Sequence, residues 1–151
     1  MTSRGRGFTL IELMIVVALI AIASAVASLA LRDPAATRLD HEAARLVALL
    51  EVARTEARAA GLAASWQPET PAEGVPGFRF VGFPPSNDRP TQWLVPGVSA
   101  QVVGARAVQL GPEPMIGAQR IVLRLDEQRL TVATDGLGPF VVVDDVPASS
   151  S

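Results

Sequence analysis

One carboxylate, Glu12, stands in an otherwise uncharged stretch that runs from Phe8 to Leu31. A charged side chain in a membrane-spanning helix costs about 2.5–3.5 kcal/mol at the helix centre. Glu12 lies one turn from the start of the stretch, where the helix dipole favours a negative charge. A carboxylate that is buried there requires a cation. The type and position of Glu12 therefore suggest an ion pair with a positively charged group.

The stretch from Phe8 to Leu31 is long enough to cross a membrane. Its 24 residues would span about 36 Å as a helix, and the hydrocarbon core of a bilayer is about 30 Å thick. Arg4 and Arg6 precede it, so the positive-inside rule places the N-terminus in the cytoplasm. We expect the residues that follow the stretch to lie across the membrane.

Two ordinary interpretations of this stretch are a signal anchor and a cleaved secretory signal peptide. Ala25-Val26-Ala27, which precedes Ser28, fits the small residues of a secretory cleavage site. Neither interpretation explains Glu12, because neither kind of segment gains from a carboxylate. A helix that packs among identical helices of other subunits would gain a partner for it. Glu12 therefore favours a third interpretation, an assembly signal.

A sequence motif supports the third interpretation. Residues 7–12 read Gly-Phe-Thr-Leu-Ile-Glu, and residues 13–17 continue with Leu-Met-Ile-Val-Val. This motif resembles the class III signal of type IV pilins and type II secretion pseudopilins. The resemblance implies that a prepilin peptidase cuts between Gly7 and Phe8 and that Phe8 is then N-methylated. It also implies that Glu12 pairs with the terminal amine of a neighbouring subunit during assembly.

The implied cleavage would supply the cation that Glu12 needs. It removes Arg4 and Arg6 and leaves a terminal amine at Phe8, close to the carboxylate along the chain. Gly7 suits a cleavage site because it has no side chain to obstruct the protease. The need of Glu12 for a cation and the cleavage that the motif implies therefore lead to the same interpretation.

A second helical pattern follows Pro34. Proline lacks a backbone donor and clashes with the preceding turn, so we expect Pro34 to end or kink the first helix. Apolar residues then recur at spacings of three and four, which indicates one face of a helix; they are Leu39, Ala43, Leu46, Leu50, Ala53, Ala57 and Ala60. Gly61 is placed to cap the C-terminal end. We expect the apolar face to pack on its own domain.

Charged residues occupy other positions of this second helix, and we expect them on its solvent side; they are Glu42, Arg45, Glu51, Arg54 and Arg58. The spacing predicts two i,i+3 ion pairs, Glu42 with Arg45 and Glu51 with Arg54.

After Gly61 the apolar pattern changes to period two, which is typical of strands. We predict strands at residues 62–67, 78–83, 92–95, 100–110, 120–125, 129–134 and 140–143. The fifth and sixth form a hairpin in which Leu130 and Val132 meet the apolar face of the fifth. Asp135-Gly136 predicts a turn before the last strand.

Helices first and strands later predict an α+β fold. The expected architecture is a long N-terminal transmembrane and amphipathic helix packed on an antiparallel β-sheet, which is also the pilin architecture. We predict a leader peptide at 1–7, a transmembrane assembly helix at 8–31, a periplasmic domain at 32–146 and a flexible tail at 147–151.

Two further segments resemble the H-type (GspH-like) minor pseudopilins. They are residues 45–61 and the Thr134-Asp135-Gly136 turn before an apolar strand. The resemblance implies a minor pseudopilin of a type II secretion system, single-pass in the inner membrane with a periplasmic C-terminal domain. Its partners would be other major and minor pseudopilins, the prepilin peptidase and the inner-membrane assembly platform.

Two other functions stay open. One is a minor type IV pilin of the FimT/FimU group, which would act in pilus priming or DNA uptake. The other is a monomeric membrane-tethered binding module without a filament role. DNA binding requires clustered cations, whereas the net charge is -2 and no arginine follows Arg129. We therefore expect no nucleic acid partner.

Residues for catalysis or metal binding are sparse. The chain has no cysteine and one histidine, which excludes disulfides and cysteine-ligated metals. His41 lies between Asp40 and Glu42, but consecutive helix residues do not share a face. Asp144 and Asp145 are acidic neighbours without further spaced carboxylates, which a calcium loop needs. We predict no enzyme activity, no metal and no cofactor.

Overall fold

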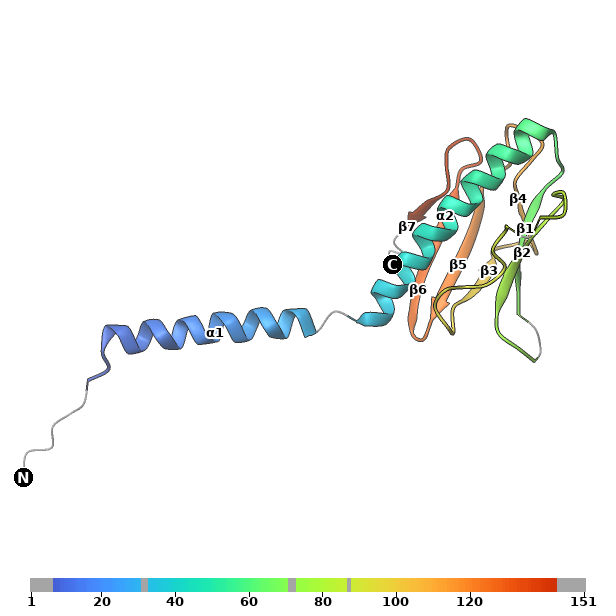
Figure 1. Ribbon diagram of the computed structural model, residues 1–151. Coiled ribbons are helices and arrows are strands. Elements are labelled where there is room, and N and C mark those ends of the chain that lie inside the picture. The colour runs from blue at the N-terminus through green and yellow to red at the C-terminus, as the bar shows by residue number, and fades with distance from the viewer. Residues whose placement is uncertain (1–6, 31–32, 71–72, 87, 144–151) are drawn as a thin grey trace, which may run out of the picture. The chain divides into compact units, whose positions relative to one another are not determined.

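A computed structural model describes residues 7–30, 33–70, 73–86 and 88–143 of the chain (Figure 1). The chain divides into two units, the first ending at Asp33 and the second beginning at Pro34. The first unit contains helix α1, Leu10–Ala30. The second contains helix α2, Pro34–Ala60, and seven antiparallel strands among its described residues. The predicted α+β fold is confirmed, and its helix-on-sheet arrangement is pilin-like.

Helix α1 carries a single charge, Glu12, in its first turn. Residues Leu10–Ser28 form the one helix in the described part of the chain that is long and apolar enough to cross a membrane, judged by length and composition. The helix is shorter than the predicted Phe8–Leu31 stretch. Phe8 precedes its first turn, and Leu31 lies outside the described residues.

Both ends of α2 follow from the local sequence. The helix begins at Pro34, in the first turn, where the missing backbone N–H is not required. At the other end Gly61 has a positive φ of 63°. The N–H of Leu62 donates to the carbonyl of Ala57 at 2.8 Å, which satisfies a carbonyl that the helix end leaves free. The predicted break at Pro34 and the predicted cap at Gly61 are both confirmed.

The strands form two antiparallel sheets. The first sheet has the strand order β2-β1-β4, and its strands are β2 (Gly77–Val81), β1 (Ser65–Glu69) and β4 (Val108–Gln109). The second sheet has the strand order β3-β5-β6-β7, and its strands are β3 (Ser99–Val102), β5 (Gln119–Leu125), β6 (Gln128–Thr134) and β7 (Val141–Val143). Helix α2 lies across one face of the strands of the second unit (Figure 1).

The predicted hairpin is confirmed. Strands β5 and β6 pair with Ile121 opposite Val132 and Leu123 opposite Leu130. Asp126 adopts a φ of 52° in the two-residue turn, a conformation that aspartate tolerates better than most residues. A turn with positive φ matches the twist of the paired strands.

Three of the predicted strands differ from the structure. The first is displaced, because β1 runs from 65 to 69 and not from 62 to 67. Residues 100–110 are split into β3 and β4, since the chain turns at Gly104, which has a φ of 73°. Residues 92–95 form no strand; Gln92 alone makes an isolated bridge to Gly77.

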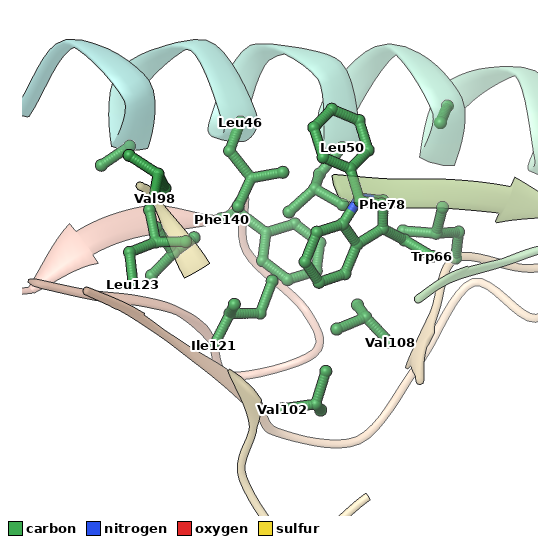
Figure 2. Packing of buried hydrophobic residues seen from close by; sticks show 14 of the residues in the cluster. Leu46, Leu50, Trp66, Phe78, Val98, Val102, Val108, Ile121, Leu123 and Phe140 are labelled. Carbon is green, nitrogen blue, oxygen red and sulfur yellow. The ribbon is translucent and has the colours of Figure 1, made fainter. Parts of the chain in front are cut away.

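The predicted apolar face of α2 packs against the sheets. Leu39, Ala43, Leu46, Leu50, Ala53 and Ala57 are buried, and only Ala60, in the last turn, is exposed. Leu46 and Leu50 point into a cluster with Phe140 and Phe78 (Figure 2). The Ala-rich end permits close approach, because a Cβ at Gly111 would lie 2.9 Å from the Cβ of Ala57.

Candidate functional site

Two ionic groups, centred on Glu42 and Arg54, tie α2 to the loops around it. The side chain of Glu42 is 2% exposed, and its Oε1 accepts the backbone N–H of Leu94 at 2.9 Å and of Val95 at 3.1 Å. Its Oε2 pairs with Arg45 Nη1 at 3.4 Å, and Nη1 also donates to the carbonyl of Gln92 at 3.3 Å. The N–H groups of Leu94 and Val95 are therefore not free to pair with a neighbouring strand, which explains why residues 92–95 form no strand.

The second group holds the loop before β7. Arg54 is 2% exposed and donates to the carbonyls of Gly138 at 2.6 Å and Gly136 at 3.0 Å. Glu51 Oε1 lies 3.6 Å from Arg54 Nη1 and accepts the N–H of Phe140 at 2.8 Å. Arg54 thus neutralises Glu51 and binds two carbonyls of one loop. We infer a structural role for this group, because all its partners belong to its own unit.

Both predicted i,i+3 ion pairs are therefore confirmed. The expectation that Glu42 and Arg54 face solvent is wrong. Glu42 lies three residues after Leu39, and Arg54 lies four residues after Leu50, so each sits at the border of the apolar face. This spacing is a signal in the sequence that the two side chains can be buried. The sequence does not show the loop carbonyls and N–H groups whose hydrogen bonds compensate for the burial of a charge.

Asp135 organises the same loop from the solvent side. Its Oδ1 accepts the N–H groups of Leu137 at 2.9 Å and Gly138 at 2.6 Å. The hydrogen bond from Gly138, followed by that from Leu137, lowers the pKa of the Asp135 carboxyl below its ordinary value. Gly136 adopts a φ of 91°, and a Cβ there would meet the carbonyl of Ile116. The predicted Asp135-Gly136 turn is confirmed.

The residues considered for metal binding do not assemble a site. His41 is exposed on α2. Among residues 7–30, 33–70, 73–86 and 88–143, no group of three histidine, cysteine, aspartate or glutamate side chains could hold a metal ion. Asp144 and Asp145 lie outside the described residues.

The N-terminal turn of α1 has a defined geometry. Thr9 precedes the helix, and its Oγ1 accepts the backbone N–H of Glu12 at 3.3 Å. The carbonyl of Thr9 accepts the N–H of Leu13 at 3.2 Å. A threonine at the N-cap with a glutamate three residues later is the spacing of a capping box. The sequence contains this Thr9-x-x-Glu12 signal, from which the cap can be predicted.

The junction between Gly7 and Phe8 lies outside the helix. Gly7 is exposed and Phe8 is 80% exposed. No other part of the described chain comes within 4 Å of the place where a Gly7 Cβ would lie. A peptide bond in such a segment can enter a protease cleft without unfolding a helix.

The carboxylate of Glu12 has no cation beside it in the described chain. The four ion pairs among the described residues involve Glu42, Glu51, Glu69 and Glu56. Apolar side chains surround Glu12 along α1 and are exposed in the subunit alone; Leu10 is 77% exposed and Met14 is 65% exposed. A helix that is apolar all round requires a membrane or neighbouring helices.

Comparison with known families bears on this segment. Residues 2–28 match the family model described as the prokaryotic N-terminal methylation motif. The chain carries a methylation motif of the type IV pilin and pseudopilin class. No curated protein and no solved structure matches the chain significantly.

The methylation motif includes Gly7, Phe8, Thr9 and Glu12, so the geometry described above belongs to the matched segment. Proteins with this motif are structural subunits that assemble with other pilin-like subunits after processing by a prepilin peptidase. The apolar helix α1 is compatible with membrane anchoring of such a protein. The motif does not distinguish pseudopilins of type II secretion from pilins.

Proposed function

We propose that the chain is a minor pseudopilin of a type II secretion system, of the H type, that assembles into the periplasmic pseudopilus. The observation that carries this proposal is the position of Glu12. It is the single charge of α1, it lies in the first turn, and its backbone is held by Thr9. If Phe8 is residue one of the mature chain, Glu12 is residue five.

Maturation would complete the site chemically. Cleavage between Gly7 and Phe8 creates an amine on Phe8, and N-methylation leaves that amine able to carry a positive charge. In the subunit alone the Glu12 carboxylate stands among exposed apolar side chains. Insertion beside another subunit brings the carboxylate to a methylated amine, and the low dielectric of the surroundings strengthens their attraction.

The proposed organisation follows from this role. Residues 1–7 are the leader, residues 8–31 the assembly helix, residues 32–146 the periplasmic domain and residues 147–151 the tail. Arg4 and Arg6 keep the N-terminus in the cytoplasm. The partners are other pseudopilins, the prepilin peptidase and the inner-membrane assembly platform, and the subunit is neither an enzyme nor a nucleic acid binder.

Maturation is tested by co-expression of the full chain with a prepilin peptidase, followed by intact-mass and N-terminal analysis. We expect a chain that begins with N-methylated Phe8. A mature chain that begins at Ser28 would instead support the secretory signal peptide. A chain that retains Met1 to Gly7 would support the signal anchor.

Assembly is tested with Glu12→Gln, which keeps the size of the side chain and removes its charge. We expect normal cleavage but loss of incorporation into pseudopili and reduced secretion. Glu113→Gln, an exposed site in the second unit, serves as the control. Normal secretion by Glu12→Gln would remove the main support for a filament role. Incorporation into type IV pili, with no effect on secretion, would favour the minor pilin instead.

A further inference from the structure

The sheet β3-β5-β6-β7 has one face turned away from the core. Along β5 the residues Ile121, Leu123 and Leu125 are buried, whereas Arg120 and Arg124 between them are exposed. Side chains alternate between the two faces of a strand. The exposed residues of β5 therefore belong to the outer face of the sheet, opposite the face that packs on the core.

Three arginines gather on this outer face. Arg120 and Arg124 lie on β5, and Arg129 lies on β6 directly opposite Arg124. Side chains directly opposite on antiparallel strands have Cβ atoms about 4.5–5.5 Å apart, and like charges placed in this way are destabilising. We call these three residues the arginine face.

The side chains of the arginine face do not contribute to the fold in the way that those of five other arginines do. Ion pairs occupy Arg45, Arg54, Arg79 and Arg89, and Arg58 donates to a carbonyl at 2.7 Å. The side chains of Arg120, Arg124 and Arg129 make no hydrogen bond or ion pair within the part of the chain that the structure describes. Two opposed arginines whose side chains have no partner among residues 7–30, 33–70, 73–86 and 88–143 form a suitable site for an anion.

The neighbours of the arginine face indicate which kind of anion. Val122 lies on the same face, and Val143 of β7 is paired with Thr131 and 42% exposed. Arginine beside apolar residues is typical of protein interfaces. A long polyanion such as nucleic acid would meet the carboxylates of Asp126 and Glu127 at the hairpin turn, and the exposed residues of this face include no aromatic ring for base stacking.

We propose that the arginine face binds an acidic segment of a partner protein, with carboxylates on Arg124 and Arg129 and apolar side chains against Val122. Two guanidinium groups side by side can each bind a carboxylate through two hydrogen bonds. This proposal does not depend on the filament role, because it concerns the second unit alone.

The test uses the purified full chain in detergent and a fluorescent peptide of alternating glutamate and valine. Fluorescence anisotropy should show binding that Arg124→Gln/Arg129→Gln weakens about tenfold. The control Arg38→Gln/Arg79→Gln removes the same charge from exposed positions elsewhere and should bind as the wild type does. The thermal midpoint of Arg124→Gln/Arg129→Gln should not fall, because a repulsive pair has been removed.

Three results would overturn the proposal. One is equal binding by the Arg124→Gln/Arg129→Gln variant and the wild type. Another is an equal loss of binding in the control variant, which would indicate attraction to net charge alone. The third is tighter binding of a short DNA duplex than of the peptide, with the same dependence on Arg124 and Arg129, which would make the face a nucleic acid site.

Discussion

The backbone N–H of Glu12 donates a hydrogen bond to Thr9 Oγ1 across 3.3 Å. The hydroxyl satisfies one of the N–H groups that the first turn of a helix leaves free. Inside a bilayer no water would replace this acceptor. Thr9 thereby fixes the turn that carries the single charge of α1.

Replacement of Thr9 by alanine should loosen that turn without removing the charge. Loss of an N-cap hydroxyl costs about 1 kcal/mol, which raises the exchange-competent population of the first turn roughly fivefold. Hydrogen exchange of the Glu12 amide in the detergent-solubilised protein measures this change. Thr9→Ser, which keeps the hydroxyl, should exchange at nearly the wild-type rate. Equal exchange in Thr9→Ala and wild type would contradict the capping role.

Glu42→Ala should destabilise the second unit strongly. The substitution leaves the N–H groups of Leu94 and Val95 without their acceptor, and hydrogen bonds to a charged group contribute about 1.5–3 kcal/mol each to stability. We expect a loss of about 3 kcal/mol in the free energy of unfolding, measured by urea titration.

Asp40→Ala is the matched control for Glu42→Ala. It removes a carboxylate two residues away on the same helix, at an exposed position. Surface changes of this kind usually alter stability by no more than about 0.5 kcal/mol. Comparable losses in the two variants would show that the charge of α2 matters, and that the bonds to residues 94 and 95 do not.

Replacement of Arg54, even by lysine, should lower the stability of the second unit. Arg54→Met removes the cation that faces Glu51 and the two hydrogen bonds that the guanidinium donates to the carbonyls of Gly138 and Gly136. Breaking a buried pair on one side costs about 3–5 kcal/mol. Arg54→Lys keeps the charge but loses the fork that reaches both carbonyls, so its stability should lie between wild type and Arg54→Met.

Thermal unfolding of wild type, Arg54→Lys and Arg54→Met measures this order of stability. Arg38→Met is the control, because Arg38 is exposed on the same helix. Hydrogen exchange should locate the damage in the loop from Gly136 to Phe140. Wild-type protection of that loop in Arg54→Met would refute the anchoring role.

The elements that sequence predicted well are those with a local cause. The apolar spacing of α2, the cap at Gly61 and the β5–β6 hairpin each depend on residues close together in the chain. The methylation motif is similar, because its residues are consecutive. Elements that are determined by neighbouring residues can be predicted without knowledge of the contacts that distant parts of the chain make.

The elements that sequence missed depend on distant partners. Residues 92–95 have the composition of a strand, but the Glu42 carboxylate, about fifty positions away, takes their donors. The sequence predicts Arg54 on the solvent side of α2, because its acceptors, the carbonyls of Gly136 and Gly138, are more than eighty positions away and leave no local signal. The arginine face appears only once the β5–β6 register brings Arg124 opposite Arg129.

Asp135 should make the stability of the second unit depend on pH in the acid range. Its folded pKa lies below the ordinary value of 3.8, because its carboxylate accepts the N–H groups of Gly138 and Leu137. A carboxyl whose pKa falls on folding stabilises the protein above pH 3.8, and this contribution is lost as the pH drops through the folded pKa. The wild type should therefore lose more stability than Asp135→Asn between pH 6 and pH 3.

The measurement is the thermal midpoint of each protein across that pH range. Glu113→Gln is the control, since it removes an exposed carboxyl group and should keep the wild-type pH dependence. Asparagine at 135 still offers an oxygen to Gly138, so at pH 6 the turn should persist in Asp135→Asn with only the charge missing. Parallel pH curves for wild type and Asp135→Asn would show that the carboxylate of Asp135 does not stabilise the loop that Arg54 holds from the opposite side.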